Sequence, residues 1–313
     1  MDIVVVAQDI AKLHRLTVVD DFEPERDHDA LGRVTLRCVD GRGRWLVLSV
    51  GERRHASIFP DGYRREGELR IPGIITRGDN PVPHEVEEYL GGHRWADHWP
   101  MQGLPFRAEL VARAVSAYRR MRHAFGALEL PRTRMYLDWH ARCIRWTRIA
   151  YHGGLLTAPE ASKARWRLLV LSPSDFEIGH GKFALTHLLD VPMCGAEIGL
   201  IDLAHVRWVP RYYDLASLCW ASWFHTSTEQ LRDVTGTLRA MCGILDAAST
   251  PDERRQSAVM VDQFRRVLLE RAIGALADLA RDVEHVHRTL RAEVERRDQL
   301  VTFLQELVRR LIA

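Results

Sequence analysis

The hydrophobic pattern changes character once along this chain of 313 residues, and that change limits the folds it can adopt. Before about residue 82, short apolar runs alternate with turn-forming residues, which is typical of strands and turns. Beyond about residue 104, apolar side chains recur mainly at helical spacing. We therefore expect an α+β chain with two lobes. Residues 1–103 would form a β-rich N-terminal lobe with one helix, and residues 104–313 a mostly helical C-terminal lobe.

Local signals predict individual elements of the N-terminal lobe and the start of the helical lobe. The apolar runs 34–39 and 45–50 flank the turn residues 40–43, a pattern that predicts a β-hairpin. A helix is predicted over residues 84–90, because glutamates occupy what would be its first turn. Residues 105–126 carry apolar side chains three and four positions apart, which predicts a longer helix.

The C-terminal lobe is predicted to contain extended segments before it becomes helical. Four runs have the composition of strands: 134–151, 166–171, 183–189 and 197–203. Beyond Asp214 the pattern is helical almost to the end of the chain. The dipeptide Thr250-Pro251 marks a helix start, because proline is favoured at the first helical position.

Composition excludes several classes of protein. The chain has 44 basic and 42 acidic residues, so it lacks the basic excess that nonspecific nucleic-acid binding requires. No apolar run approaches the roughly 20 residues of a membrane-spanning helix, and the N-terminus lacks the pattern of a secretory signal. The 5 cysteines are scattered, as expected of reduced thiols. We expect a cytoplasmic protein without a transmembrane segment, with peripheral contact at the inner face of the membrane left open.

The densest group of chemically useful side chains lies between residues 180 and 214. His180, His187, Asp202 and Asp214 all fall in this segment. Asp202 ends an apolar run, where a carboxylate can hold a metal ion while the strand stays buried. Three of these residues also have a structural alternative. Asp202 would cap the next turn, His187 would be a core histidine, and Asp214 would cap the helix that follows it.

The same segment resembles a known family of kinases. The chain reads His180-Gly181-Lys182-Phe183-Ala184-Leu185-Thr186-His187, then Ile201-Asp202-Leu203-Ala204-His205-Val206-Arg207, then Tyr213-Asp214-Leu215-Ala216. Over residues 180–223 this order is similar to the lipopolysaccharide core kinases that phosphorylate heptose and Kdo, which have a protein kinase-like fold. Aminoglycoside kinases share that architecture. The resemblance implies a two-lobed protein kinase-like fold for the whole chain.

The resemblance also assigns roles to the residues that match. The catalytic aspartate of the family falls on Lys182, two residues after His180. His187 and Asp202 occupy the two positions on the metal side, and Asp214 occupies the position that braces the catalytic loop. ATP and Mg²⁺ are the cofactors that the resemblance implies, and the sequence leaves open whether either binds.

Three features of an active kinase are missing. Lys182 carries a positive charge and has no acceptor for the proton of a hydroxyl group. No lysine lies between residues 12 and 163, so the strand at 45–50 offers only Leu48 or Ser49 in place of a lysine that would bind phosphates. No glycine-rich loop precedes that strand. These departures predict a pseudokinase with a binding or regulatory role in core oligosaccharide assembly, whose partner is another kinase or a glycosyltransferase of that pathway.

Two alternatives remain at this stage. One is an active ATP-dependent phosphotransferase, acting on a sugar or another small molecule, with a rearranged site. In that case Asp190 or Asp175 would act as the base, and Arg44 or Arg53 would replace the missing lysine. The other is a non-kinase α+β binding module in which the segment 180–214 is purely structural.

Overall fold

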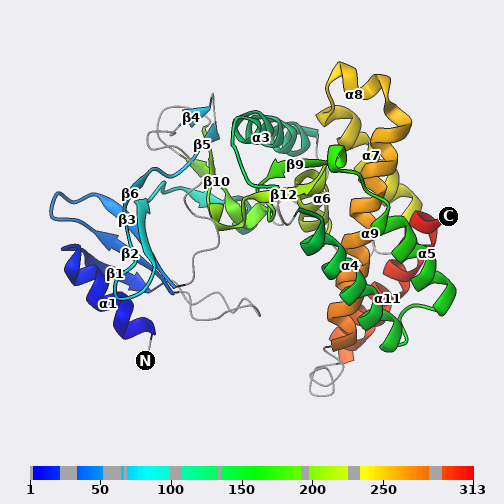
Figure 1. The fold of residues 1–313 in the computed structure, drawn as a ribbon, viewed down its shortest axis with the longest axis horizontal. Helices are drawn as coiled ribbons and strands as arrows, with labels where there is room; N and C mark the ends of the chain where they lie inside the picture. Colours follow the sequence, from blue (N-terminus) through cyan, green and yellow to red (C-terminus); the bar gives the residue numbers. More distant parts are fainter. Residues whose placement is uncertain are drawn as a thin grey trace. The chain divides into compact units, whose positions relative to one another are not determined.

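A computed structural model places most of the chain and divides it into two compact units (Figure 1). The first unit is Met1–Trp95 with Thr186–Val206, and the second is Ala96–Leu185 with Arg207–Ala313. The structure describes residues 3–21, 34–51, 65–66, 69–98, 108–132, 135–191, 197–224, 233–281 and 291–313. No helix among these residues is long and apolar enough to cross a membrane.

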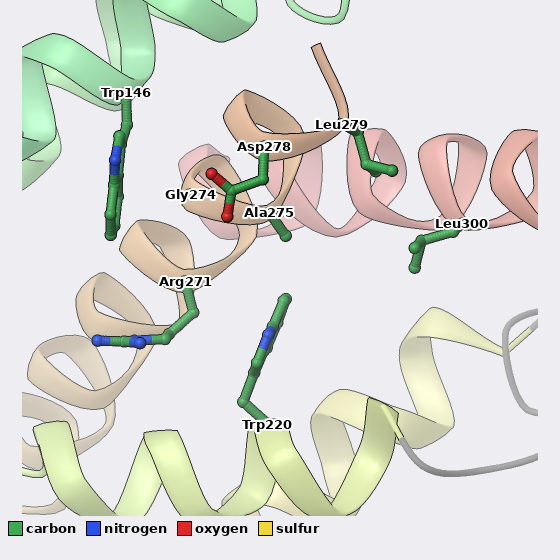
Figure 2. Close-up of a pocket in the computed structure, with 8 residues that line it drawn as sticks. All are labelled: Trp146, Trp220, Arg271, Gly274, Ala275, Asp278, Leu279 and Leu300. Atoms are coloured by element: carbon green, nitrogen blue, oxygen red, sulfur yellow. The ribbon is translucent and has the colours of Figure 1, made fainter. Parts of the chain in front are cut away.

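The second unit is built mainly of helices. They are α3 (Ala108–Gly126), α4 (Met135–His152), α5 (Ala158–Leu169), α6 (Tyr213–Phe224), α7 (Val234–Ala248), α8 (Pro251–Arg255), α9 (Ser257–Arg281) and α11 (Arg291–Ile312). The short helix α2 (Trp95–His98) begins at the boundary between the units. Helix α9 is central, because α4, α6 and α11 all pack against it (Figure 2). Strands β9 (Phe176–Gly179) and β12 (Arg207–Pro210) form a two-stranded antiparallel sheet.

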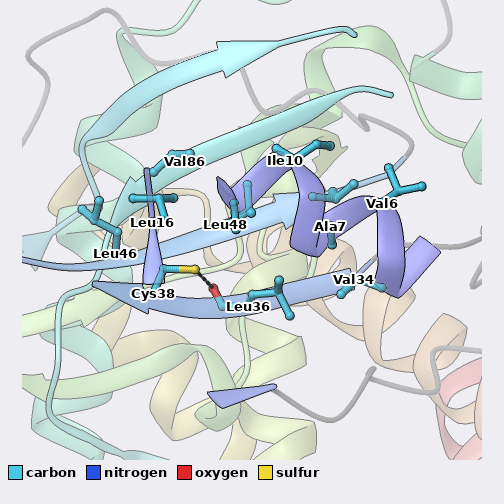
Figure 3. Close-up of a cluster of buried hydrophobic side chains, with 12 residues drawn as sticks. Val6, Ala7, Ile10, Leu16, Val34, Leu36, Cys38, Leu46, Leu48 and Val86 are labelled. Carbon is cyan, nitrogen blue, oxygen red and sulfur yellow. Dashed lines mark hydrogen bonds between the residues drawn. The ribbon is translucent and has the colours of Figure 1, made fainter. Parts of the chain in front are cut away.

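The first unit contains a five-stranded antiparallel sheet covered by one helix. The strands, in spatial order, are β1 (Thr17–Asp21), β2 (Val34–Val39), β3 (Trp45–Val50), β7 (His84–Glu88) and β6 (Ile74–Gly78). Helix α1 (Ile3–Leu13) packs on β1, β2 and β3. Figure 3 shows the resulting core, in which Ile10 of α1 lies over Leu36 and Leu48 of the sheet. These side chains are almost fully buried, so the core provides the hydrophobic stabilisation of this unit.

A second sheet in the first unit accounts for a difference from the predicted lobes. Its strands, in spatial order, are β4 (Arg65–Glu66), β5 (Leu69–Arg70), β11 (Glu197–Leu200), β10 (Leu188–Val191) and β8 (His93–Arg94). Strand β11 pairs with β5 and β10 pairs with β8, so backbone hydrogen bonds tie residues 186–206 to the first unit. The sequence placed these residues in the C-terminal lobe, because long-range strand pairing leaves no local signal.

Several predicted elements are confirmed. Strands β2 and β3 form the predicted hairpin, with Val39 opposite Trp45 across the turn. The helix predicted over 105–126 is α3. Thr250 caps α8 with its side chain, and Pro251 is the first helical residue.

Three segments differ from the prediction because tertiary packing outweighs the local signal. Residues 84–90 contain strand β7 and not a helix: Glu85 lies opposite Arg77 of the neighbouring strand β6, and Glu88 pairs with Arg70 of β5 in another sheet. Residues 134–151 and 166–171 were predicted to be extended but belong largely to α4 and α5. In α4 the buried positions recur at helical spacing, which the tryptophans and isoleucines obscured in the sequence.

The start of the chain is also helical, since α1 occupies part of the stretch expected to contain only strands and turns. Its buried residues are Val6, Ala7, Ile10 and Ala11. These buried positions have the spacing of one helix face.

Candidate functional site

A tight loop follows strand β9 and is held by a buried carboxylate of helix α6. The backbone N–H of His180 donates to Asp214 Oδ2 at 2.7 Å, and the N–H of Gly181 donates to Oδ1 at 2.9 Å. Asp214 is only 2% exposed and lies in the first turn of α6. Its carboxylate therefore binds the loop and does not act as a simple helix cap, which was the structural alternative.

Two glycines make this arrangement possible. A Cβ at residue 179 would lie 2.3 Å from Asp214 Oδ2, so only glycine lets the carboxylate approach the strand end. Gly181 has φ of +77°, a conformation that side-chain-bearing residues rarely adopt. The backbone leading into Lys182 is thus fixed by the sequence, whereas an ordinary surface loop would be loosely specified.

The electrostatic environment of Asp214 is unusual for an aspartate. Burial raises its pKa to about 7, and the nearby Glu177 carboxylate adds to the increase. The N–H groups of the loop act in the opposite direction, because they stabilise the ionised form. Arg207, at the start of β12, reaches the loop from the other side, with Nη2 3.5 Å from the carbonyl oxygen of Gly181.

Two of the predicted catalytic positions lie on this loop. His180 is fully buried and its ring contacts Phe183 edge-on, with ring centroids 6.2 Å apart. Lys182 is half-buried. Neither side chain can accept a proton in the way that a carboxylate base does, since an ammonium group has no acceptor and a buried imidazole is shielded from a substrate.

The predicted metal-side residues lie together in the first unit. His187 Nε2 is 3.4 Å from Asp202 Oδ2, and His205 Nε2 is 3.3 Å from the same oxygen. Asp202 has φ of +61°, in the left-handed region, and its side chain makes no capping hydrogen bond to the turn that follows. The cap proposed as its structural alternative is therefore absent. Non-glycine residues in this conformation often mark functional sites.

These donors do not fit Mg²⁺. A hard cation prefers six oxygen ligands, whereas this group supplies one carboxylate and two imidazoles. Both imidazoles already contact the same carboxylate oxygen. Within the described part of the chain, no cluster of three or more histidine, cysteine, aspartate or glutamate side chains is arranged to hold a metal ion.

The strand that should bind phosphates does not fit ATP either. Leu48 of β3 is completely buried in the sheet core and presents no cation. Ser49, its neighbour, lies opposite Thr35 on one side and Glu85 on the other. Neither the leucine nor the serine supplies the positive charge that a phosphate group requires.

The residues considered as replacements are committed to other contacts. Asp175 accepts hydrogen bonds from the N–H and hydroxyl of Ser172 and from the Gln263 amide, so its side chain caps the start of a short 3-10 turn. Asp190 accepts a hydrogen bond from the Trp95 indole. Arg44 pairs with Asp40 in the β2–β3 hairpin. Arg53 lies outside the described residues.

One charged cluster was missed by sequence reasoning. Glu270 of α9 is fully buried, with Arg142 Nε 2.7 Å from one carboxylate oxygen and Arg271 Nε 3.1 Å from the other. Arg142 and Glu270 are 128 positions apart, so no spacing in the sequence indicates their pairing. The only local signal is a helix rich in arginine and glutamate, and such a composition usually indicates a solvent-exposed face and not a buried ion pair.

Comparison with solved structures identifies the architecture. The amicoumacin kinase hAmiN, in complex with AMP-PNP, Ca²⁺ and amicoumacin ("Ami"), superposes with a TM-score of 0.61 at 13% identity, over 99% of this chain and 94% of that one. The chain has a protein kinase-like fold. Choline kinase LicA from Streptococcus pneumoniae gives a TM-score of 0.53 at 11% identity, covering 96% and 98% of the two chains. Choline kinase from Cryptosporidium parvum Iowa II gives 0.51 at 11% identity, covering 99% and 97%.

The kinase-like fold agrees with the two-lobed α+β architecture expected from the sequence and excludes an α+β module of unrelated fold. No family model matches the sequence, and no curated protein matches it. Membership of the lipopolysaccharide core kinases stays a prediction that rests on residues 180–223.

Proposed function

We propose that the chain is a pseudokinase, a protein with a kinase-like fold that binds a ligand or partner and does not transfer a phosphoryl group. The observation that carries the proposal is the position of Lys182 on the loop held by Asp214. The resemblance places the catalytic aspartate there. Because the loop backbone is fixed by two required glycines, the lysine occupies a defined position and not a loosely specified one.

Electrostatics explains why this substitution would abolish the reaction. Phosphoryl transfer depends mainly on positioning and on stabilisation of charge by groups placed in advance. An ammonium group beside the acceptor hydroxyl cannot orient it by accepting its proton, and it repels a metal ion. The buried Leu48 on β3 and the histidine-rich surroundings of Asp202 point the same way.

The narrower proposal concerns the pathway. Similarity of residues 180–223 to lipopolysaccharide core kinases supports a role in core oligosaccharide assembly. The partner in that role is another kinase or a glycosyltransferase, regulated by binding. Nucleotide and Mg²⁺ are not required for such a role.

A phosphotransfer assay tests the proposal. Purified full-length protein is incubated with labelled ATP, Mg²⁺ and a panel of acceptors: an aminoglycoside, choline and a core oligosaccharide. We expect no turnover above background for wild type, for Lys182→Asp or for the control Lys163→Ala on the exposed face of α5. Lys182→Asp is expected to stay inactive because the phosphate-binding lysine is missing as well.

Turnover by wild type would overturn the proposal if it belongs to this chain and not to a contaminant. Asp202→Asn distinguishes the two, because it removes the remaining metal-side carboxylate. Wild-type turnover that Asp202→Asn abolishes would show an active phosphotransferase. Turnover that survives Asp202→Asn and depletion of the protein would be contamination and would leave the chain inactive, as proposed.

A further inference from the structure

The second unit contains a pocket that none of the predicted catalytic residues lines. Its volume is about 370 Å³, and it lies among α4, α6, α9 and α11. Small-molecule sites typically have volumes of about 300–1,000 Å³. The lining residues are Trp146, Trp220, Arg271, Gly274, Ala275, Asp278, Leu279 and Leu300 (Figure 2).

One face of α9 forms a wall of this pocket. The lining positions 271, 274, 275, 278 and 279 follow the spacing of a single helix face. Figure 2 shows the Trp146 indole reaching α9 from α4 and the Trp220 indole reaching it from α6. The pocket therefore has two aromatic surfaces, contributed by helices that are far apart in the sequence.

Gly274 has a specific role in this wall. A Cβ at this position would lie 2.8 Å from Cζ3 and 2.9 Å from Cε3 of Trp146, closer than a side chain can tolerate. A glycine inside a helix costs about 1 kcal/mol relative to alanine. Here the missing side chain lets the indole of Trp146 lie against the helix backbone, so the glycine shapes the aromatic wall.

The charge at one end of the pocket is positive. Glu270 is the carboxylate that both Arg142 and Arg271 contact, so its single negative charge faces two guanidinium groups. Burial and repulsion by Arg142 and Arg207 lower the pKa of Arg271 to about 9, and the group is still charged at neutral pH. Arg271 Nε lies 3.1 Å from Glu270 Oε2, and the guanidinium stacks on the Tyr213 ring at 4.3 Å.

The opposite end of the pocket has an acidic side chain, that of Asp278. Asp278 lies two helical turns beyond Arg271, is exposed, and has Arg281 4.0 Å away. Its charge is therefore screened by water and by a neighbouring cation. The charge that a ligand meets beside the indoles is the excess positive charge of two arginines that share one carboxylate, and Arg271 is the member of that group that lines the pocket.

We propose that this pocket binds a small aromatic carboxylate. The planar ring packs against the indoles of Trp146 and Trp220, and the carboxylate pairs with Arg271. Aromatic pairs contribute beyond the apolar area they bury, and an arginine–carboxylate hydrogen bond is among the stronger ones in proteins. The site is independent of the proposed loss of phosphoryl transfer, because its occupant needs no nucleotide.

The test measures binding of four probes to the full-length protein by calorimetry. Indole-3-carboxylate has both features, indole lacks the charge, cyclohexanecarboxylate lacks the aromatic ring, and tryptamine has the opposite charge. We expect indole-3-carboxylate to bind at least tenfold more tightly than each of the other three. No binding of indole-3-carboxylate, or equal binding of tryptamine, would overturn the proposal.

Variants assign the binding to this pocket. Arg271→Gln is expected to weaken indole-3-carboxylate binding about tenfold or more and to leave indole unchanged, whereas Trp220→Leu weakens both. The matched control is Arg265→Gln, which removes an arginine of α9 that lies outside the lining. If Arg271→Gln fails to fold, Arg271→Lys takes its place. That variant keeps the charge and should retain the affinity for indole-3-carboxylate within severalfold. Trp220→Leu still tests whether binding occurs in this pocket. Affinity unchanged in Trp220→Leu, or lowered equally by the control, would place the binding elsewhere and reject the site.

Discussion

Asp214 is the residue whose environment determines the conformation of the loop that carries Lys182. Its carboxylate accepts the N–H groups of His180 and Gly181 while it is almost completely buried. A buried carboxylate pays a desolvation cost when it ionises, and the hydrogen bonds recover only part of it. The loop is therefore held by a group that titrates near neutral pH, with its pKa raised to about 7.

This shift predicts a pH dependence of stability. The folded protein holds the Asp214 proton more tightly than the unfolded chain, whose pKa is near the ordinary 3.8. Stability should therefore fall as pH rises between about 4 and 7, and no further loss from this group occurs above 7. Relative to Asp214→Asn, which mimics the neutral acid, wild type should lose about 1.4 kcal/mol per pH unit in that window.

Urea unfolding at intervals from pH 4.5 to pH 8 measures this slope. Asp40→Asn is a suitable control, because hydrogen bonding by the Arg44 backbone lowers the pKa of Asp40 and the group stays ionised throughout the range. The difference between wild type and Asp40→Asn should be constant across these pH values. Parallel curves for wild type and Asp214→Asn would contradict the assigned pKa.

Glu270 is the second residue with a large expected effect. Truncation to alanine leaves Arg142 and Arg271 without the carboxylate that both contact. Removal of one partner from a buried ion pair typically costs about 3–5 kcal/mol. Glu306→Ala is the control, since Glu306 is exposed in its pair with Arg310 and should cost about 1 kcal/mol or less. Chemical denaturation compares the two, and equal losses would show that Glu270 is not an essential partner.

At the scale of elements, capping explains where some helices begin. Thr250 and Glu253 form a reciprocal capping box at the start of α8. Thr250→Ala should reduce the free energy of unfolding by about 1 kcal/mol, because one backbone N–H loses its acceptor. Thr250→Ser should retain most of that stability. Thr302→Ala on α11 is the control, because that hydroxyl donates only to Asp298 of its own helix; a loss as large as that of Thr250→Ala would argue against the cap.

Some elements of the fold could be predicted from the sequence and others could not. The β2–β3 hairpin and α3 follow from local patterns, since turn residues and helical spacing are contained within about 20 positions. Strand β7 was mistaken for a helix because its acidic residues pair with arginines of other segments, and such pairs leave no local spacing. Helix α4 was mistaken for a strand because its tryptophans favour strands, although Trp139 and Cys143 are buried on one helical face.

One of the candidate sites could be predicted from the sequence, and the other could not. The sequence brought His187 and Asp202 together through the resemblance, and the structure places them 3.4 Å apart. The pocket in the second unit was not predictable, because Trp146, Trp220 and Arg271 come from three helices whose packing is a tertiary property. One signal was available: Gly274 interrupts a strong helical pattern, and an interior glycine often has a packing reason.

For the molecule as a whole, the kinase-like fold and the side chains at the expected phosphate and metal positions make opposite predictions about nucleotide binding. A ligand that binds the folded state at 100 times its Kd adds about 2.7 kcal/mol of stability, so binding is visible in thermal unfolding. The fold alone suggests that ATP with Mg²⁺ would stabilise the chain. The buried Leu48 in place of a lysine and the unsuitable donors around Asp202 indicate that it would not.

We therefore expect the melting temperature to stay unchanged when ATP is added, with or without Mg²⁺. The reason is that, among the described residues at the positions considered, Leu48 and Ser49 offer no cation to a phosphate and the donors around Asp202 do not suit Mg²⁺, so contacts that would offset the entropy of binding are not supplied there. The measurement is a thermal unfolding titration to millimolar ATP, repeated with Asp202→Asn. A rise in melting temperature that requires Mg²⁺ and disappears in Asp202→Asn would show that this carboxylate still holds a nucleotide–metal complex. That result would show that the chain binds nucleotide together with a metal ion. A rise that does not require Mg²⁺ would show metal-independent nucleotide binding. In either case the group that binds phosphate would have to be sought among the arginines.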